Sequence, residues 1–349
     1  MDRAVAAGAA ALPAEYCRAL QAHALAPLWT ALHDLLPFER TTRAVPWLWR
    51  WREVRPLLLE AARLVSLEQA ERRVLVLANP GLGGAYAATS TLYAGLQVIM
   101  PGEVAPSHRH TPAAIRLVLE GRGAFTTVEG VRCVMEPGDL ILTPAGRWHD
   151  HGHRGPEPVV WLDGLDIPLV SAFEAAWCSK PSPPPPEVAE TDPSTDEFTA
   201  AGLVPRRSRY PATGTPQVRW PWRVVRPALE RLAAGAPPGQ PVVLRYVDPT
   251  TGRPPLATMG CEVRWLRPGE RSRPERRAAS AVCHVIEGRG WSQVGAARLD
   301  WAAGDTFAVP PGHRVEHGNG SPAEPAVLFQ FDDEPARRAL GLWDEEAET

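Results

Sequence analysis

A long internal repeat restricts the fold of this 349-residue sequence more than any other feature. The segment IRLVLEGRG at residues 115–123 returns as VCHVIEGRG at residues 282–290, which is 167 residues later. Other segments that return at a similar spacing are PGE (101–103 and 268–270), PGDLILTP and AGDTFAVP (137–144 and 303–310), and VRPLLLEAARL and VRPALERLAAG (54–64 and 225–235). Repetition of this kind indicates the duplication of a whole structural unit. We therefore expect two domains with the same fold, which also suits the length of the chain.

Most of the repeated unit consists of short predicted β-strands joined by turns. Ala124–Val128 and Val131–Met135 flank a Glu-Gly dipeptide, which is typical of a hairpin turn. Leu140–Thr143 predicts a further strand, and Val74–Ala78 and Thr89–Met100 predict two strands that lead into the first copy. The predicted fold class is therefore all-β, with helices near the N-terminus.

Three helices are predicted ahead of these strands. Ala14–Leu36 has apolar residues at helical spacing and is closed by Pro37. Val54–Leu64 carries Pro56 near its first turn, where proline is tolerated. Ser66–Arg73 opens with a serine, which is a favourable N-cap residue.

Three histidines lie where strands of the first copy are expected to meet. His108 and His110 form an HxH pair, and residues i and i+2 of a strand point to the same face. His149 follows the predicted strand Leu140–Thr143 and a turn that returns the chain to the same interior. Three inward imidazoles on neighbouring strands would form a mononuclear metal site with open coordination positions, which is typical of a catalytic site.

The spacing around these histidines resembles the cupin signature. Its first motif, G-x5-H-x-H-x3-E-x6-G, is matched by Gly102, the HxH pair and Gly121, and its second motif, P-G-x5-P-x-G-x2-H, is matched over 137–149. The resemblance implies a bicupin, in which each copy of the repeat forms one double-stranded β-helix (jelly-roll) barrel. One position departs from the signature, because the usual glutamate ligand is Ala114. A divalent ion held by three neutral imidazoles keeps its full charge, which favours an anionic, chelating substrate.

These features divide the chain into four expected parts. They are a helical N-terminal arm (1–80), a metal-binding barrel (81–180), a proline-rich linker (181–215) and a second barrel (216–345). We expect the second barrel to hold no metal and to have a structural role. Alignment of the two copies puts Glu275, Arg277 and Val315 at the positions of the three histidines. The remaining histidines of the second copy, His284, His313 and His317, match no ligand position.

The composition argues against several classes of partner. The 37 basic and 40 acidic residues are nearly balanced, so no nucleic-acid or membrane partner is expected. No apolar run reaches the length of a transmembrane span, and the N-terminus does not resemble a signal peptide. The five scattered cysteines form no CxxC pair and are expected to be buried thiols in a reducing cytoplasm.

Longer segments resemble the gentisate 1,2-dioxygenase family of ring-cleaving bicupins, which includes salicylate, nitrosalicylate and 1-hydroxy-2-naphthoate dioxygenases. The segments are AVPWLWRWREVRPLLLEAARL, ERRVLVLANPG, TLYAGLQVIMPGE, HRHT with VLEGRG, and GDLILTPAGRWHDHG with WLDGLDIPLV. The resemblance covers about residues 15–345. It implies one non-haem Fe(II) per chain, O2 as co-substrate and a homotetramer. It also implies extradiol-type cleavage between the carboxyl-bearing and hydroxyl-bearing ring carbons of gentisate or a related ortho-hydroxybenzoate.

Two residues near the histidines suit this chemistry. Arg116 has the same parity as His110, and an inward arginine in an apolar strand needs a partner such as a bound carboxylate. The alternative is an arginine at the rim of the barrel. His151 shares the face of His149 and is the candidate acid or base, because imidazole titrates near neutral pH. The alternative for His151 is a structural role beside the metal.

The family resemblance implies further positions beside the site. Asp163, in WLDGLD, is implied as a third catalytic residue that orients His151 or Arg116. The implied substrate-binding positions are Tyr93, Gly95, Gln97 and Arg72. Gly95 leaves room for a ring substituent. For Arg72, an exposed basic residue before a strand is the alternative.

Other classes of function stay open at this point. Cupin barrels also host isomerases and decarboxylases that use zinc or manganese, and a metal cupin can bind a small molecule without catalysis. The fold alone does not decide between these functions.

Overall fold

The computed structural model describes residues 12–180, 217–237 and 239–347. Contacts between residues divide the chain into two compact units, 1–42 and 43–349. The expected linker at 181–215 lies outside the described residues. Within the described residues, no helix is both long enough and apolar enough to cross a membrane.

The first unit contains only short helices. They are α1 (Ala14–Ala22), η1 (Leu28–Thr30) and α2 (Leu32–Leu35). The prediction of one helix over 14–36 is wrong, because α1 ends at Ala22 and Pro27 follows. A proline lacks the N–H that a helix interior needs and also disfavours helical geometry in the residue before it. None of the side chains in these three helices is buried.

Two helices lie near the start of the second unit. α3 (Trp51–Leu64) begins earlier than the predicted Val54 and contains Pro56. α4 (Leu67–Ala70) is shorter than predicted, but Ser66 is its N-cap as expected. The Ser66 hydroxyl accepts from the backbone N–H of Gln69, and the Gln69 side chain returns to the Ser66 backbone, which completes a capping box.

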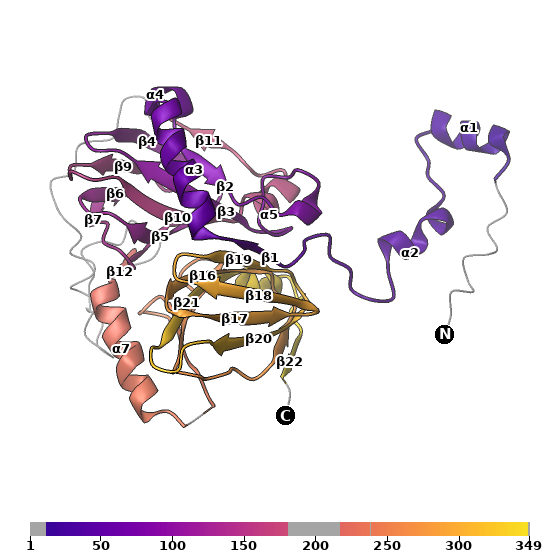
Figure 1. The fold of residues 1–349 in the computed structure, drawn as a ribbon. Coiled ribbons are helices and arrows are strands. Elements are labelled where there is room, and N and C mark those ends of the chain that lie inside the picture. The colour runs from indigo at the N-terminus through magenta and orange to yellow at the C-terminus, as the bar shows by residue number, and fades with distance from the viewer. Residues whose placement is uncertain (1–11, 181–216, 238, 348–349) are drawn as a thin grey trace. The chain divides into compact units, whose positions relative to one another are not determined.

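The first barrel consists of two antiparallel sheets (Figure 1). One has the order β12-β8-β5-β10-β3-β2, and the other has the order β11-β4-β9-β6-β7. The strands are β2 (Val74–Val76), β3 (Tyr93–Ile99), β4 (Val104–His110), β5 (Ala114–Glu120), β6 (Ala124–Val128), β7 (Val131–Val134), β8 (Leu140–Thr143), β9 (His149–His153), β10 (Val159–Leu165), β11 (Cys178–Ser179) and β12 (Arg219–Trp220). The short helices η2 (Pro80–Leu82) and α5 (Ile167–Ala172) lie between them in the sequence. The predicted hairpin β6–β7 and the predicted strand β8 are confirmed.

The second barrel repeats this plan with sheets of order β1-β19-β16-β21-β14-β13 and β18-β17-β20-β15-β22. Its strands are β1 (Trp47–Trp49), β13 (Val242–Arg245), β14 (Gly260–Leu266), β15 (Glu275–Arg277), β16 (Ala281–Glu287), β17 (Arg289–Val294), β18 (Ala297–Ala302), β19 (Thr306–Val309), β20 (Arg314–Asn319), β21 (Ala326–Asp332) and β22 (Glu345–Ala347). Its helices are α7 (Trp222–Gly235) and α8 (Glu334–Ala339). The predicted all-β fold with two jelly-roll barrels is therefore confirmed.

The two barrels exchange segments at their junction. β1 pairs with β19 of the second barrel, although α3, which follows it, contacts β3 of the first. In the counterpart, β12 pairs with β8 of the first barrel, whereas α7 contacts β13 and β14 of the second. Each helix therefore begins on one barrel and packs against the other.

A carboxylate anchors the start of each exchanged helix. The backbone N–H of Trp51 donates to Asp305 Oδ1, and that of Trp222 donates to Asp139 Oδ1, both at 2.8 Å. These aspartates occupy the same place in the two copies of the repeat, and glycine precedes each of them. A Cβ on Gly138 would lie 2.3 Å from the Trp222 ring, and one on Gly304 would lie 2.6 Å from the Trp51 ring. The repeated Gly-Asp pair thus accommodates the tryptophan of the exchanged helix.

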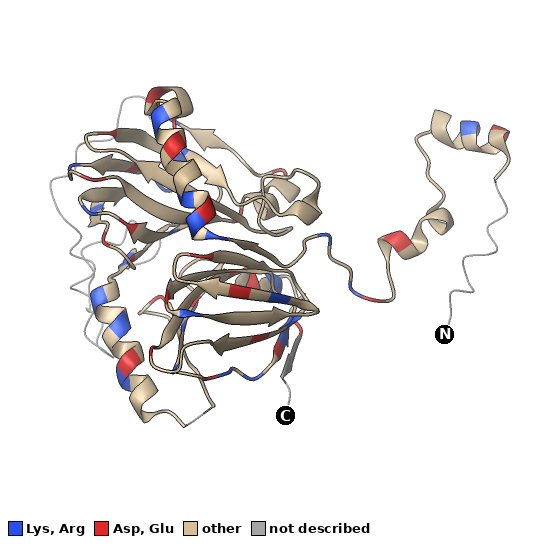
Figure 2. Ribbon diagram, in the orientation of Figure 1, with Lys and Arg blue, Asp and Glu red and all other residues tan. Residues whose placement is uncertain are grey.

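Repeated glutamates attach the bodies of the same helices. Figure 2 shows charges of both signs along α3 and α7. Arg55 Nε of α3 lies 2.9 Å from Glu120 of the first barrel, and Arg226 Nε of α7 lies 2.8 Å from Glu287 of the second. Both glutamates belong to the repeated EGRG segment. The sequence repeat therefore includes the residues whose ion pairs attach each helix to its barrel.

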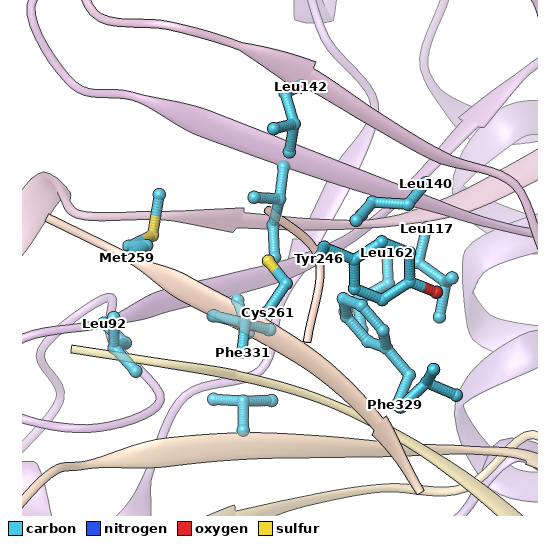
Figure 3. Close-up of a cluster of buried hydrophobic side chains, with 14 of the residues drawn as sticks. Leu92, Leu117, Leu140, Leu142, Leu162, Tyr246, Met259, Cys261, Phe329 and Phe331 are labelled. Atoms are coloured by element: carbon cyan, nitrogen blue, oxygen red, sulfur yellow. The ribbon is translucent and has the colours of Figure 1, made fainter. Parts of the chain in front are cut away.

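One hydrophobic core lies between the facing six-stranded sheets. Figure 3 shows Leu117 and Leu162 of the first barrel close to Tyr246 and Phe329 of the second. Burial of one such side chain contributes roughly 1.5–3 kcal/mol. Because both barrels contribute to a single core, each six-stranded sheet is covered only when the other barrel is present.

We predict that the two anchoring aspartates contribute unequally to stability. Asp305→Ala should lower the free energy of unfolding by about 1–2 kcal/mol, as expected for the loss of a helix cap. Asp139→Ala should cost about 3–5 kcal/mol, because Asp139 also accepts two hydrogen bonds from the buried Arg219. Urea unfolding would measure the free energy of unfolding of both variants, with Asp300→Ala, at an exposed position, as the control. Equal losses in the two variants would contradict this assignment.

Candidate metal centre

The three predicted ligand histidines come together inside the first barrel. His108 and His149 lie directly opposite each other on β4 and β9, and His110 is two residues farther along β4. One ring nitrogen from each lies within 4.8 Å of the others. This is the one such group of histidine, cysteine and acidic side chains found among the described residues. His149 is buried, and the other two are half-buried.

Backbone carbonyls orient two of these rings. His110 Nδ1 lies 2.7 Å from the Pro112 carbonyl, and His149 Nδ1 lies 3.0 Å from the Arg147 carbonyl. A carbonyl only accepts, so each Nδ1 carries the proton and each Nε2 keeps its lone pair. His149 Nε2 is buried and has no hydrogen-bond partner. A buried nitrogen lone pair without a partner, held by a carbonyl on the other side of its ring, suits a metal ligand.

The protonation of the three histidines also suits a metal. Burial, followed by the charge of Arg72, lowers the pKa of His108 to about 3. Burial lowers the pKa of His110 and takes that of His149 well below its usual value. The rings are therefore neutral at pH 7 and need not lose a proton to bind a metal.

Arg72 contacts the third ring. Its Nη2 lies 2.7 Å from His108 Nδ1 and 3.0 Å from the Pro106 carbonyl. Since arginine only donates, His108 Nδ1 accepts in this contact. A metal bound through Nε2 would require the proton on Nδ1, so Arg72 must then release this ring. The half-buried Arg72 therefore lies at the site, and the alternative of an exposed basic residue does not fit its contacts.

The donor set fits a divalent transition metal. Imidazole ligands suit iron, zinc, copper and nickel, and three protein ligands leave positions open for a substrate. Ala114, where the cupin signature has glutamate, is fully buried at the start of β5. The described residues thus provide three neutral ligands and no carboxylate for such an ion.

Arg116 points into the barrel and is fully buried beside Asp163. The two residues face each other across β5 and β10, with 3.3 Å between Arg116 Nε and Asp163 Oδ1. Arg116 Nη1 donates to Thr143 Oγ1 at 2.6 Å, and Trp161 Nε1 donates to Asp163 Oδ2 at 3.0 Å. Of the two partners expected for Asp163, the structure therefore selects Arg116. Arg116 Nε and Asp163 Oδ1 are buried without a hydrogen bond, although their charges are close.

The charges of this pair lie in a poorly solvated place. Burial raises the pKa of Asp163 to about 6, against the opposing effect of Arg116. Burial also lowers the pKa of Arg116. A buried guanidinium with a single carboxylate beside it offers a favourable site for a second anion.

His151 is also buried beside the three histidines. Its ring centre lies 5.8 Å from that of His149 and 5.4 Å from that of Trp161. His151 Nδ1 lies 2.8 Å from Thr126 Oγ1, directly across from it on β6. Burial holds the pKa of His151 well below its usual value. The ring is therefore neutral, and burial disfavours its charged form.

The substrate-binding positions predicted on β3 lie opposite β10. Tyr93, Gly95 and Gln97 alternate along the strand, and Gly95 pairs with Asp163. A Cβ on Gly95 would lie 2.6 Å from the Tyr93 hydroxyl and 2.5 Å from a Val74 methyl carbon. Glycine is thus the residue that fits between these two side chains. Burial raises the pKa of the Tyr93 hydroxyl, which stays protonated.

The second barrel has the same register with different residues at its centre. Glu275 lies opposite Val315, as His108 lies opposite His149. Glu275 pairs with Arg264 and Arg277, both at 3.0 Å. Beside them, a cavity of about 30 Å³ extends to Asp332, whose pKa is raised to about 7 by burial and by the charge of Glu262. The centre of this barrel therefore consists of paired charges.

The histidines of the second barrel bond different side chains and form no cluster among the described residues. His284 bonds Thr306, and His317 bonds Ser292.

Sequence reasoning missed the polar partners of the site. Thr126, Thr143 and Trp161 contact the predicted residues. Thr126 lies outside the quoted motifs, and no role was predicted for Thr143 and Trp161 within theirs. The alternation of the strands could have placed them inward, because 126 has the parity of the inward face of β6. The expectation of buried thiols is wrong for Cys178, which is exposed beside the site, on β11 opposite His110.

Comparison with known proteins extends this assignment. The cupin domain family matches residues 95–165, which lie in the first barrel. A gentisate 1,2-dioxygenase from Ralstonia sp is 42% identical over 343 residues, covering 95% of this chain and 94% of the relative. A 5-aminosalicylate 1,2-dioxygenase from Comamonas sp is 38% identical and covers 93% of this chain and 87% of the relative. The solved structure of a salicylate 1,2-dioxygenase from Pseudaminobacter salicylatoxidans matches with a TM-score of 0.89 at 31% identity, covering 97% of this chain and 99% of that one.

The fold and the histidine cluster define a bicupin with a three-histidine centre in its first barrel. The solved salicylate 1,2-dioxygenase shares this architecture over nearly its whole length, and the relatives matched by sequence are named as dioxygenases. The chain belongs to the gentisate 1,2-dioxygenase family of ring-cleaving dioxygenases. The resemblance noted in the sequence is thereby confirmed.

We predict that His108→Ala, His110→Ala and His149→Ala each lose most of the bound metal. A site with three protein ligands has no spare donor to replace the missing one. Metal analysis of the purified variants would measure this, with His313→Ala and His317→Ala as controls that keep the metal. A parent protein with nearly two metal ions per chain would contradict a single site.

Proposed function

We propose that this chain is an Fe(II)-dependent ring-cleaving dioxygenase that acts on gentisate or a related ortho-hydroxybenzoate, such as salicylate or a 5-substituted salicylate. The observation that carries this proposal is the pairing of three neutral histidine ligands with a buried arginine in the same barrel. Neither the histidines nor Ala114 offers the metal a negative charge. An anionic substrate with a carboxylate and an adjacent phenol oxygen complements both the metal and the arginine. Relatives that act on gentisate and aminosalicylate support this choice.

Arg116 binds the carboxylate of the substrate in this proposal. Its Nη1 is held by Thr143, and Asp163 lies against Nε, so the guanidinium has a fixed direction. Among the described residues, no side chain accepts from its Nη2. A charge-assisted hydrogen bond from this atom would hold the carboxyl end of the ring.

His151 accepts the proton of the phenol in this proposal. The ring is neutral in the free protein, and the negative charge of a bound substrate would offset the burial that disfavours its charged form. Its Nδ1 already lies 2.8 Å from Thr126 Oγ1. Nε2 is therefore the atom available for proton transfer. The substrate loses a phenol proton to this atom and gains the charge that a dicationic metal favours.

The strand β3 forms the wall beside the aromatic ring. Tyr93 presents a neutral hydroxyl, Gly95 lets the side chains of Tyr93 and Val74 lie close to the strand, and the buried Gln97 supplies an amide. Arg72, beside His108, adds a second cation for the substrate or for reduced oxygen. These roles agree with the residues that the family resemblance implied.

The proposed reaction needs no external reductant. Bound Fe(II) would supply the redox chemistry with O2. The carbon–carbon bond between the carboxyl-bearing and hydroxyl-bearing ring carbons breaks, and one oxygen atom of O2 is added at each of these carbons. The substrate provides all the electrons, and the ring-opened acid contains both oxygen atoms.

The proposal also includes the biological setting. We place the enzyme in the cytoplasm, as expected from its five free cysteines, and we expect a homotetramer from the family resemblance. The alternatives of a zinc or manganese isomerase or decarboxylase, or of a non-catalytic metal cupin, have no such support among the relatives.

Oxygen uptake tests the proposed function. The iron-loaded protein should consume O2 with at least one of gentisate, salicylate, 5-substituted salicylates or 1-hydroxy-2-naphthoate, with one O2 used per ring opened. Phenols without the ortho-carboxylate should give no uptake, because they lack the group that pairs with Arg116. The zinc-loaded protein is the control. A lack of uptake with every ortho-hydroxybenzoate would overturn the proposal.

We predict that Arg116→Ala keeps its metal but binds carboxylated substrates more weakly. The loss of a charge-assisted bond in a buried pocket should cost about 2–5 kcal/mol of binding free energy. Anaerobic titration with a substrate would measure it. Arg277→Ala, which removes an arginine from the centre of the second barrel, is the matched control and should leave the affinity unchanged. Equal affinity of Arg116→Ala and the parent protein would show that Arg116 has no contact with the carboxylate.

A further inference from the structure

An arginine of the first barrel is stacked between two tryptophan rings. The guanidinium carbon of Arg109 lies 4.7 Å from the centre of the Trp148 ring and 5.4 Å from that of the Trp177 ring. Both distances are typical of a cation–π contact. Arg109 Nε is buried and has no hydrogen-bond partner, so the rings provide its surroundings in place of water.

The stack involves a sequence neighbour of each of the three clustered histidines. Arg109 lies between His108 and His110 on β4, and Trp148 directly precedes His149. Neighbouring residues of an extended chain point to opposite faces, so the stack lies behind the histidines and not among them. It therefore joins, from behind, the two segments that carry the whole cluster.

The stack lies where the pairing of β4 with β9 ends. The register of these strands shifts just before His108, and His108–His149 is the last residue pair between them. An irregularity of this kind interrupts the hydrogen bonds of a ladder. Beyond the last pair, the Gly146 N–H donates to the His110 carbonyl at 2.8 Å. The stack adds a side-chain connection at the point where regular strand pairing stops.

Glu129, in the turn between β6 and β7, fixes the backbone of Trp148. Its carboxylate accepts from the Trp148 N–H at 2.7 Å, and its own N–H donates to the Trp148 carbonyl at 2.9 Å. Glu129 has a φ of 45°, in the left-handed region that favours glycine. The glutamate keeps this unfavourable conformation and supplies a hydrogen bond that glycine could not. The residue before His149 is therefore held by its backbone and by its ring.

Hydrogen bonds to Thr111 hold Trp177 against the same strand. The Trp177 N–H donates to Thr111 Oγ1 at 2.9 Å, and the Thr111 N–H donates to the Trp177 carbonyl at 3.1 Å. The next two residues form β11, in which Ser179 pairs with Arg109. Trp177 thus has a fixed place over the guanidinium, although its ring is only half-buried.

The second barrel keeps the register of this region but not the stack. Its backbone contacts correspond, since the Gly295 N–H donates to the Arg314 carbonyl and the Ala278 N–H donates to the Asp344 carbonyl, at 2.8 and 2.9 Å. The residues at the places of Arg109, Trp148, Trp177 and Glu129 are therefore Arg276, Arg314, Asp344 and Gly295. An arginine opposite an arginine offers no ring to stack on. Among the described residues, this stack accompanies the histidine cluster and is not repeated where the cluster is missing.

We propose that Arg109 is a positioning residue that, stacked between Trp148 and Trp177, holds the two ligand-bearing segments so that their histidines converge on one metal ion. Arg109 touches neither the metal nor the substrate and acts through its neighbours. The inference rests on the three histidines as metal ligands and not on the substrate or the reaction proposed above.

Zinc affinity, measured on the full chain by competition with a chelator, tests this proposal without turnover. Arg109→Met keeps a long side chain but loses the planar charge that stacks on the rings. We expect it to bind zinc about 10-fold more weakly, at the low end of the effect of residues that support metal ligands. Arg276→Met removes the corresponding arginine of the second barrel and should bind zinc as the parent protein does.

Cobalt in place of zinc reports the arrangement of the ligands. The visible absorption of bound Co(II) depends on the number and geometry of its ligands, so Arg109→Met should change this spectrum and Arg276→Met should not. Trp148→Phe keeps an aromatic face for the guanidinium and should retain the spectrum and the zinc affinity of the parent. Trp148→Leu should resemble Arg109→Met. The double variant should bind zinc no more weakly than either single variant, because both changes remove one interaction.

Urea unfolding of the metal-free proteins separates positioning from stability. An Arg109→Met variant that is less stable but has the zinc affinity and cobalt spectrum of the parent would overturn the proposal, because the stack would then be only structural. Equal losses of zinc affinity in Arg109→Met and Arg276→Met would also overturn it. A His149→Ala variant that binds zinc as tightly as the parent would overturn the ligand assignment and this proposal with it. A lack of oxygen uptake with every ortho-hydroxybenzoate would instead overturn only the proposed function.

Discussion

The two barrels depend on each other through the exchange of α3 and α7. Asp305 and Asp139 each accept the first backbone N–H of a helix that packs on the other barrel. The sheets that face each other across the junction then share one core, in which Leu117 and Leu162 lie. These leucines are sequence neighbours of Arg116 and Asp163, and residues next to each other in a strand point to opposite faces. The second barrel thus supports the sheet that holds the buried arginine in place.

The site combines a dry interior with a set of charges that a divalent ion would leave unbalanced. The four histidines around it are kept neutral by burial, and Arg116 has one carboxylate close to it. A divalent ion added to this set would leave a large positive charge where water can do little to screen it. An anionic substrate is the natural counter-charge. The missing glutamate at Ala114 and the buried arginine therefore favour the same substrate class.

The parts of the site that depend on local spacing could be predicted from the sequence. The HxH pair and His149 followed from strand periodicity and motif spacing, and β6, β7 and β8 lie where alternation and a turn placed them. The helix over 14–36 was wrong because the apolar spacing outweighed Pro27. The hydrogen bonds of Thr126 and Thr143 could not be predicted, because each depends on the register between strands that lie apart in the sequence. Trp161 lies two residues from Asp163 on the same strand, so strand alternation could have predicted that contact. The sequence predicted that Arg116 pairs with a bound anion, and the structure adds the Asp163 carboxylate as a partner within the protein.

The duplication let one barrel change its charges without loss of the fold. The positions of Arg116 and Asp163 are taken in the second barrel by Cys283 and Gln330, which share a hydrogen bond of 3.5 Å. In the second barrel, arginines lie instead at positions 264 and 277, where Glu262 and Glu275 pair with them. A centre in which each charge already has a partner within the protein needs no ligand to be stable. In the first barrel, Arg116 has Asp163 and Thr143 as partners, but the buried Nε2 of His149 has no partner within the protein and would be completed by a group from outside the chain. The same fold therefore supports a centre of paired charges in the second barrel and, in the first barrel, a centre with positions left for a ligand. The proposed chemistry of the first barrel requires these positions.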